Sequence, residues 1–163
     1  MATAVDPLSL ERQVCFALAV ANRSVLGVYR PLLEPMGLTH PQYLVMLALW
    51  ERSPRSVRDI GQAIQLDSPT LSPLLKRLEG SGLISRRRDP ADERNLIVEL
   101  TDAGTALRER ALEIPPAVVE TLGVDLADLE ELHRVLTKVN AAALAAAAAQ
   151  SGGLKRDPAG GLK

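Results

Sequence analysis

The sequence has 163 residues, of which 47% are hydrophobic and 24% are charged, and its formal net charge is −1. This length suits one domain with a sizeable core, and the absence of a signal peptide or of an apolar run of about 18 residues predicts a cytoplasmic protein without a membrane span. The single cysteine excludes an internal disulfide framework, and with two distant histidines it lacks the spacing of a metal site. We therefore expect neither a metal nor another cofactor.

A long first helix is predicted from Asp6-Pro7 to about Tyr29, because Pro31 follows and a turn comes next. The helix carries Cys15. Fourteen residues are close to four helical turns, so Cys15 and Tyr29 share a face but lie ~21 Å apart along the axis. The two side chains of one chain therefore cannot touch.

Capping signals mark the next two helix starts. Thr39, with Gln42 three residues on, is typical of a capping box and opens the second helix. Ser56 with Asp59 repeats the signal and begins a short helix over residues 57–64. This short helix and the one that follows form a helix-turn-helix pair.

The last helix of this pair is amphipathic. Asp67 or Ser68 can cap it, Pro69 fits its first turn and Gly82 suits a left-handed stop. Its buried stripe consists of Leu71, Leu74, Leu75 and Leu78. The outward groups suit base edges and phosphates, and the candidate DNA contacts are Ser68, Thr70, Ser72, Lys76 and Arg77.

A β-hairpin is predicted next, and it completes the pattern of a winged helix. The strands are Leu83 to Arg87 and Leu96 to Leu100, joined by the turn-rich segment 88–95. Asp92 lies in this loop and Arg94 at its tip. Arginines also follow one another at Arg86, Arg87 and Arg88. An isolated arginine run is usually a solvated surface, but a reading helix followed by a basic hairpin favours DNA binding.

Further helices are predicted after the hairpin. Thr101 caps a helix toward Glu113, Pro115-Pro116 interrupts it, and Asp125 starts the last long helix. Apolar residues three and four apart form a narrow, coiled-coil-like seam on that helix, which with the first helix predicts a homodimer with intertwined ends. The seam consists of Leu129, Leu132, Leu136, Val139 and Ala143. The tail, 151–163, is expected to be disordered.

These elements predict a mainly α fold with a small β-hairpin wing. A single domain is expected over residues 1–150, with the winged helix-turn-helix at about 39–100 and dimerisation helices at about 7–31 and 101–149.

The distribution of charge agrees with this arrangement. Residues 52–94 carry nine Lys and Arg against six Asp and Glu, a net charge of +3, whereas residues 95–150 carry four against nine, a net charge of −5. Basic surface is thus concentrated at the reading motif.

Two segments resemble a known family. LDSPTLSPLLKRLEGSGLISRRRDPADERNLIVEL, residues 66–100, is similar to the winged helix-turn-helix of the MarR (multiple antibiotic resistance regulator) family, whose wing carries an Asp-x-Arg motif, here Asp92-Glu93-Arg94. LERQVCFALAVANR and YRPLLEPMGLTHPQYLVMLALWE resemble the organic hydroperoxide resistance regulators, in which an N-terminal cysteine senses peroxides. Cys15 stands at the position of that cysteine, and the chain resembles the one-cysteine type.

The resemblance implies a homodimeric transcriptional repressor rather than an enzyme. Its recognition helices would enter successive major grooves of a palindromic double-stranded operator, roughly 34 to 36 Å apart. Arg94 would enter the flanking minor groove, where a narrow A·T-rich groove attracts a guanidinium. Arg86, Arg87 and Arg88 would hold phosphates.

The resemblance also implies roles around Cys15. In the family a tyrosine of the partner subunit hydrogen-bonds the sulfur, and this role falls to Tyr29. The second such tyrosine is replaced here by His40, which either donates a hydrogen bond with more pH dependence or is a solvated turn residue. Without a second cysteine, a sulfenic acid formed by an organic hydroperoxide would await a low-molecular-weight thiol, cyclise or be oxidised further.

Several alternatives remain open from the sequence. A lone cysteine beside apolar residues is more often an inert hydrophobic residue, so the chain is also compatible with a MarR-type regulator that responds to a small aromatic ligand, with Cys15 structural. A thiol peroxidase would need a flanking Thr/Arg constellation that the chain does not show. A purely structural helical dimer would not bind DNA.

Overall fold

The computed structural model describes residue 6 and residues 8–92 and 95–153, with side chains up to residue 150. The chain divides into two compact units, residues 1–121 and 122–163, which are treated separately below. Within the described residues, no helix is both long and apolar enough to cross a membrane. The same residues contain no cluster of three or more His, Cys, Asp or Glu side chains able to hold a metal ion.

The first helix differs from its prediction at both ends. A single 3-10 turn, η1 (Leu10–Arg12), precedes α1 (Val14–Leu33), so the α-helix begins later than residue 7. Pro31 lies inside α1 instead of beyond it. A proline removes only one i→i−4 hydrogen bond, and so near the C-terminus this loss does not stop the helix from finishing its last turn. A second 3-10 turn, η2 (Glu34–Met36), follows.

Three helices form the centre of the first unit, and each has the cap that the sequence predicts. Thr39 N donates to Gln42 Oε1 over 2.8 Å in the expected capping box. Ser56 Oγ accepts from the amide of Asp59 over 3.1 Å. These bonds satisfy amides that a helix start leaves unpaired. The helices are α2 (His40–Glu51), α3 (Val57–Ile64) and α4 (Ser68–Gly80).

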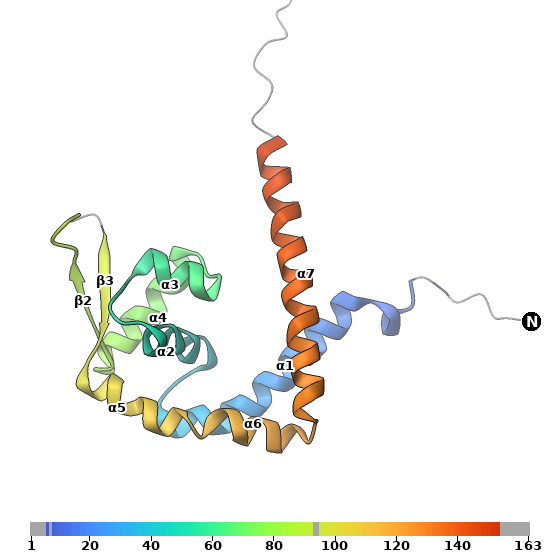
Figure 1. Cartoon of the computed structure of the whole chain (residues 1–163), viewed down its shortest axis with the longest axis horizontal. Helices are drawn as coiled ribbons and strands as arrows, with labels where there is room; N and C mark the ends of the chain where they lie inside the picture. Colours follow the sequence, from blue (N-terminus) through green and yellow to red (C-terminus); the bar gives the residue numbers. More distant parts are fainter. Residues whose placement is uncertain (1–5, 7, 93–94, 154–163) are drawn as a thin grey trace, which may run out of the picture. The chain divides into compact units, whose positions relative to one another are not determined.

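The wing is a three-stranded antiparallel sheet of order β1-β3-β2 (Figure 1). The predicted hairpin is confirmed as β2 (Ile84–Arg88) and β3 (Leu96–Leu100), with Ile84 opposite Leu100. The third strand, β1 (Arg55–Ser56), pairs with β3 and was missed because two residues carry no alternating pattern. The loop residues 93–94 lie outside the described chain.

The helix after the wing is held in place by hydrogen bonds at Gly104. Thr101 Oγ caps α5 (Asp102–Ala111), as predicted, by accepting from the amide of Gly104 over 3.0 Å. Trp50 Nε1 donates to the carbonyl of the same glycine over 2.9 Å. These bonds hold α5 against α2 and the base of the wing. Pro115 and Pro116 lie in the first turn of α6 (Ile114–Leu122), where their missing amides cost little.

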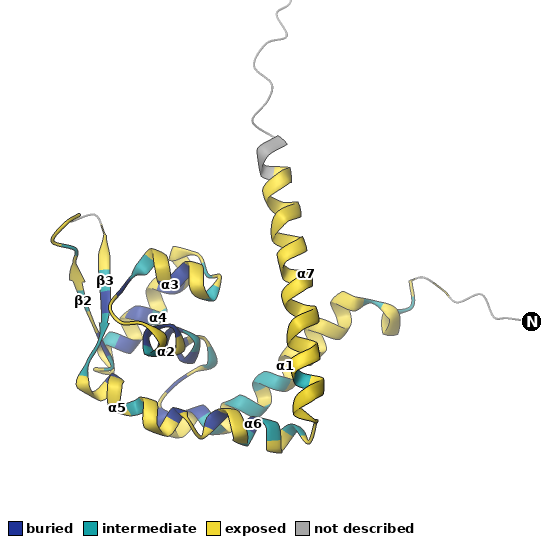
Figure 2. Cartoon of the chain, viewed as in Figure 1, coloured by how far each residue is buried: buried dark blue, intermediate teal, exposed yellow. Residues whose placement is uncertain are grey.

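The core of the first unit joins the central helices to the wing (Figure 2). Apolar side chains from α2, α3, α4 and both hairpin strands are almost fully buried there, which fixes the angle between the reading helix and the wing. They include Val45, Met46, Leu49, Ile60, Leu71, Leu75, Leu78, Ile84 and Val98.

The second unit is dominated by α7 (Leu126–Gly153). Its apolar seam residues Leu132, Leu136 and Val139 are 50%, 37% and 46% exposed. The helix continues three residues into the segment predicted to be a disordered tail, and residues 154–163 are not described.

Candidate nucleic-acid interface and cysteine site

The outward face of α4 matches its prediction. Of the predicted stripe, Leu71, Leu75 and Leu78 are buried and Leu74 is half-buried, whereas the polar candidates lie at the surface. Ser68, Thr70, Ser72, Lys76 and Arg77 are all exposed. Hydroxyl groups in the first turns followed by two cations are the groups that contact base edges and phosphates in a major groove.

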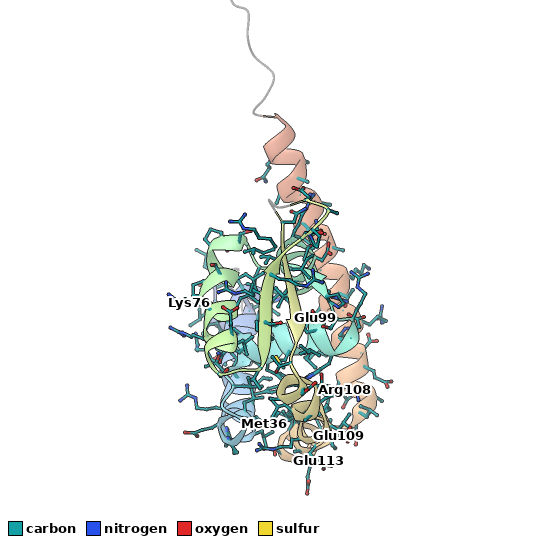
Figure 3. All side chains as sticks on the ribbon, turned by 90° about the vertical axis from the view of Figure 1, so that its left-hand side faces the viewer. Met36, Lys76, Glu99, Arg108, Glu109 and Glu113 are labelled. Carbon is teal, nitrogen blue, oxygen red and sulfur yellow. The ribbon has the colours of Figure 1, made fainter. Side chains whose placement is uncertain are left out.

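The two cations of α4 are available to a ligand. Lys76 projects from α4 into solvent (Figure 3), and Arg77 follows it in the chain. Among the residues that the structure describes, neither forms an ion pair with an acidic side chain. At the start of the helix, the hydrogen bonds that Asp67 accepts from Thr70 hold the pKa of its carboxyl below the usual range. Asp67 therefore serves as the N-cap.

The wing arginines differ from one another in their surroundings. Arg86 donates from Nε to Glu79 Oε2 over 2.9 Å and is half-buried, so its guanidinium ties β2 to α4 and is engaged by a carboxylate, whereas we expected it to be free for a phosphate. Arg87 is half exposed, with Nε 3.7 Å from Glu99 Oε2. Arg88 ends β2 and is exposed. Arg94, the predicted minor-groove contact, lies outside the described residues.

The loop of the wing is closed by Asp92. Its backbone carbonyl accepts from the amide of Asn95 over 2.9 Å, and its carboxylate accepts from the Asn95 side chain over 3.1 Å. Asp92 therefore links the two sides of the loop that carries Arg94.

A buried arginine that sequence reasoning missed joins the sheet to α2. Arg55 in β1 is only 9% exposed and donates from a terminal nitrogen to Glu51 Oε2 over 2.7 Å. Its Nε has no hydrogen-bond partner among the described residues. The four-residue spacing from Glu51 was visible in the sequence, but the burial depends on the pairing of β1 with β3.

Tyr29 and His40 come together at the other end of α2. Their rings meet edge to face, with centroids 5.1 Å apart, and Tyr43 lies 6.1 Å from Tyr29. His40 is half-buried, which lowers its pKa below the ordinary value because burial disfavours the charged ring. It also lines a hollow of about 490 Å³ with Leu26 and Arg30 of α1 and with residues of the connection between α1 and α2. His40 is thus not simply a solvated turn residue.

Cys15 is exposed at the second residue of α1, fourteen residues from Tyr29 on the same helix. Its neighbours Val14 and Phe16 are 68% and 37% exposed. The thiol is therefore not a buried hydrophobic residue within its own chain. The first half of α1 thus presents apolar side chains at the surface of the described first unit, as an interaction surface does.

Comparison with known proteins gives a consistent result. A family model described as transcriptional regulator SarA/Rot matches residues 27–110. The organic hydroperoxide resistance transcriptional regulator of Bacillus subtilis is 40% identical over 131 residues, covering 80% of this chain and 89% of the relative.

Two solved structures of AbfR, a protein from Staphylococcus epidermidis, are also similar. Reduced AbfR bound to DNA has a TM-score of 0.73 at 36% identity, covering 82% of this chain and 91% of that one. Overoxidised AbfR bound to DNA has a TM-score of 0.65 at 38% identity, covering 80% and 95%.

Proposed function

We propose a redox-regulated repressor, starting from the family of the chain, which belongs to the MarR family of winged-helix transcriptional regulators, in the branch of the organic hydroperoxide resistance regulators. In this proposal the protein binds its operator until an organic hydroperoxide oxidises Cys15. The observation that carries the redox part is the exposure of Cys15 on the same helix that holds Tyr29 against His40.

The DNA-binding part rests on the exposed face of α4 and on the wing beside it. In this proposal Ser68, Thr70, Ser72, Lys76 and Arg77 enter the major groove, and Arg87 and Arg88 contact phosphates. Arg94 contributes its guanidinium to the flanking minor groove, as the family resemblance implies. The reduced AbfR complex, with DNA bound to a chain of the same fold, supports this assignment.

We propose that the protein is a homodimer, because apolar side chains are exposed on the described part of one chain. Exposed apolar residues on α1 and along the seam of α7 would be covered by the same surfaces of a second copy. An antiparallel arrangement of the two α1 helices would also bring Cys15 of one chain to Tyr29 and His40 of the other. The two hydrogen-bonding side chains would then favour the thiolate over the thiol.

The chemistry starts from that thiolate. Its sulfur attacks one oxygen of the hydroperoxide, the S–O bond forms as the O–O bond breaks, and the alkoxide takes up a proton to leave as an alcohol. Sulfur loses two electrons and the peroxide gains them. Because the chain has only one cysteine, the sulfenic acid then reacts with an external low-molecular-weight thiol, whose sulfur forms an S–S bond to Cys15 as the S–O bond breaks and water leaves. The larger group on Cys15 at the dimer interface changes the distance between the two winged helices, and operator binding is lost.

The test is a DNA-binding titration with the promoter fragment upstream of the protein's own gene, with and without cumene hydroperoxide. We expect the reduced protein to bind, the oxidised protein to release the DNA, and a thiol reductant to restore binding. Cys15→Ser should bind like the reduced wild type and ignore the hydroperoxide. Release that persists in Cys15→Ser would contradict the sensor role and favour a ligand-responsive regulator.

A further inference from the structure

A small hollow lies between the short helix α3, the start of α4 and the wing. Its volume is about 250 Å³, and all its walls belong to the first unit. None of the roles proposed above uses it, although Ser68 forms one of its walls. The lining residues are Ser56, Val57, Arg58, Ser68, Asn95 and Leu96.

The position of this hollow matters for a winged helix on DNA, and the argument rests on the DNA-binding role proposed above. If α4 occupies a major groove and the wing occupies the adjacent minor groove, one sugar-phosphate strand separates the two grooves. That strand has to pass between the start of α4 and the wing. We propose that the hollow seats a phosphodiester of this strand and that Arg58 is the cation that holds it.

The side chains around the hollow suit a phosphate. Arg58 is exposed and forms no ion pair with an acidic residue in the described part of the chain, so its guanidinium is available. Ser68 also lines the hollow, and its hydroxyl can donate to a second phosphate oxygen at the edge of the major groove. Ser56 Oγ accepts from the amide of Asp59, which leaves its own hydroxyl proton free to donate as well.

Two further features fit a DNA strand rather than a free anion. Leu96 is 42% exposed on β3, and an apolar side chain next to a phosphate site can contact the deoxyribose. The acidic side chains nearest in sequence to the lining residues have partners of their own, and the carboxylate of Asp92 accepts from the side chain of Asn95. Asp59 lies 4.0 Å from Arg52, and Asp67 caps α4. These carboxylates stay charged, so the attraction of Arg58 for a bound phosphate has to exceed their repulsion.

Sequence reasoning missed Arg58 because it lies in α3, more than 25 residues before the arginines of the hairpin. Arg58 reaches the surface formed by α4 and the wing only because β1 and α3 pack beside the wing. Arg58 would replace Arg86, which Glu79 holds, as a phosphate-binding cation.

The first test compares Arg58→Gln with Arg108→Gln, which removes the same charge from an exposed arginine of α5. Operator affinity is measured by fluorescence anisotropy over a range of salt concentrations, after circular dichroism has verified folding. We expect Arg58→Gln to weaken binding about tenfold. We also expect the salt slope of the dimer to fall by about 1.8, since each phosphate contact contributes about 0.9. Arg108→Gln should retain the wild-type slope.

A second test changes the DNA and starts from the wild-type protein. Each phosphate of a half-site is replaced in turn by a neutral methylphosphonate, and wild-type binding should weaken most at a phosphate between the two occupied grooves. In Arg58→Gln the same replacement should have little further effect. Equal losses in both proteins at every position, or an unchanged slope in Arg58→Gln, would overturn the proposed seat alone. Failure of the wild type to bind any operator DNA would overturn the DNA-binding role together with it.

Discussion

Arg86 and Glu79 face each other across the junction of β2 and α4, with Arg86 Nε 2.9 Å from Glu79 Oε2. Both side chains are partly shielded, at 24% and 38% exposure. The hydrogen bond from Arg86 holds the pKa of Glu79 below its usual range, so the carboxylate is ionised at neutral pH. The pair therefore ties the wing to the reading helix.

A double-mutant cycle tests this positioning role. We expect Glu79→Gln and Arg86→Gln each to weaken specific operator binding by roughly fivefold, the upper end for a pair near the surface. The double variant should be no weaker than either single variant, because the same contact is lost once. The salt slope should not change. If Glu79→Gln instead strengthens binding while Arg86→Gln lowers the slope, Arg86 contacts a phosphate and the positioning role is wrong.

The elements that could be predicted depend on local signals. The caps at Thr39, Ser56, Asp67 and Thr101 each involve a partner three residues away. Such contacts can be read from spacing alone. The two strands of the hairpin were predicted within one residue for the same reason.

The contacts that could not be predicted join distant segments. Trp50 bonds to Gly104 across 54 positions, and the side chain of Arg110 donates to the carbonyl of Pro35 across 75. The retention of Arg86 by Glu79 and the burial of Arg55 also depend on which strand lies beside which helix. Neither local propensity nor periodicity encodes that choice.

Gly104 is required for packing at the base of the wing. A Cβ there would overlap the carbonyl oxygen of Leu83, which is backbone and cannot rotate away. We expect Gly104→Ala to lower the free energy of unfolding by about 1 to 3 kcal/mol, as overpacking does. Urea denaturation measures this, with Gly80→Ala as the control, because a Cβ at that position meets nothing within 4 Å. Equal stability of the two variants would contradict the close approach.

The seam of α7 predicts how the protein assembles. Replacing Leu132 and Leu136 together by Glu should give a monomeric or unfolded protein that no longer binds operator DNA, because charges would be buried in the dimer. Ala141→Glu is the matched control, since residue 141 lies about 180° from the seam at 100° per residue. Sedimentation gives the result. A double variant that remains a dimer would show that the seam is not an interface.

His40 predicts a pH dependence of stability. Burial lowers its pKa in the folded chain, so the unfolded chain binds the proton more readily as the pH falls below 6.5. The free energy of unfolding should therefore decrease from pH 7.5 to pH 5.5, and it should decrease less in His40→Tyr. Chemical denaturation at one fixed protein concentration measures both, since unfolding of a dimer depends on concentration. Parallel pH profiles of the two proteins would contradict the lowered pKa.

The same burial bears on the sensing role that we propose for His40. Because burial lowers the pKa of this ring, we expect it to act on a partner's Cys15 in the proposed dimer as a neutral hydrogen-bond donor and not as a cation. The rate of oxidation by cumene hydroperoxide, measured between pH 6.5 and 8.5, should then show no inflection that belongs to His40. His40→Tyr keeps a ring and a donor, so its profile should have the same shape. His40→Phe lacks the donor and should react more slowly at pH 7, because the thiolate loses a hydrogen bond that stabilises it. Stopped-flow measurement of thiolate absorbance gives the rates.

A second inflection in the wild-type pH profile of the oxidation rate that disappears in His40→Tyr would contradict this role. It would mean that the imidazole titrates in this range and assists the thiolate as a cation.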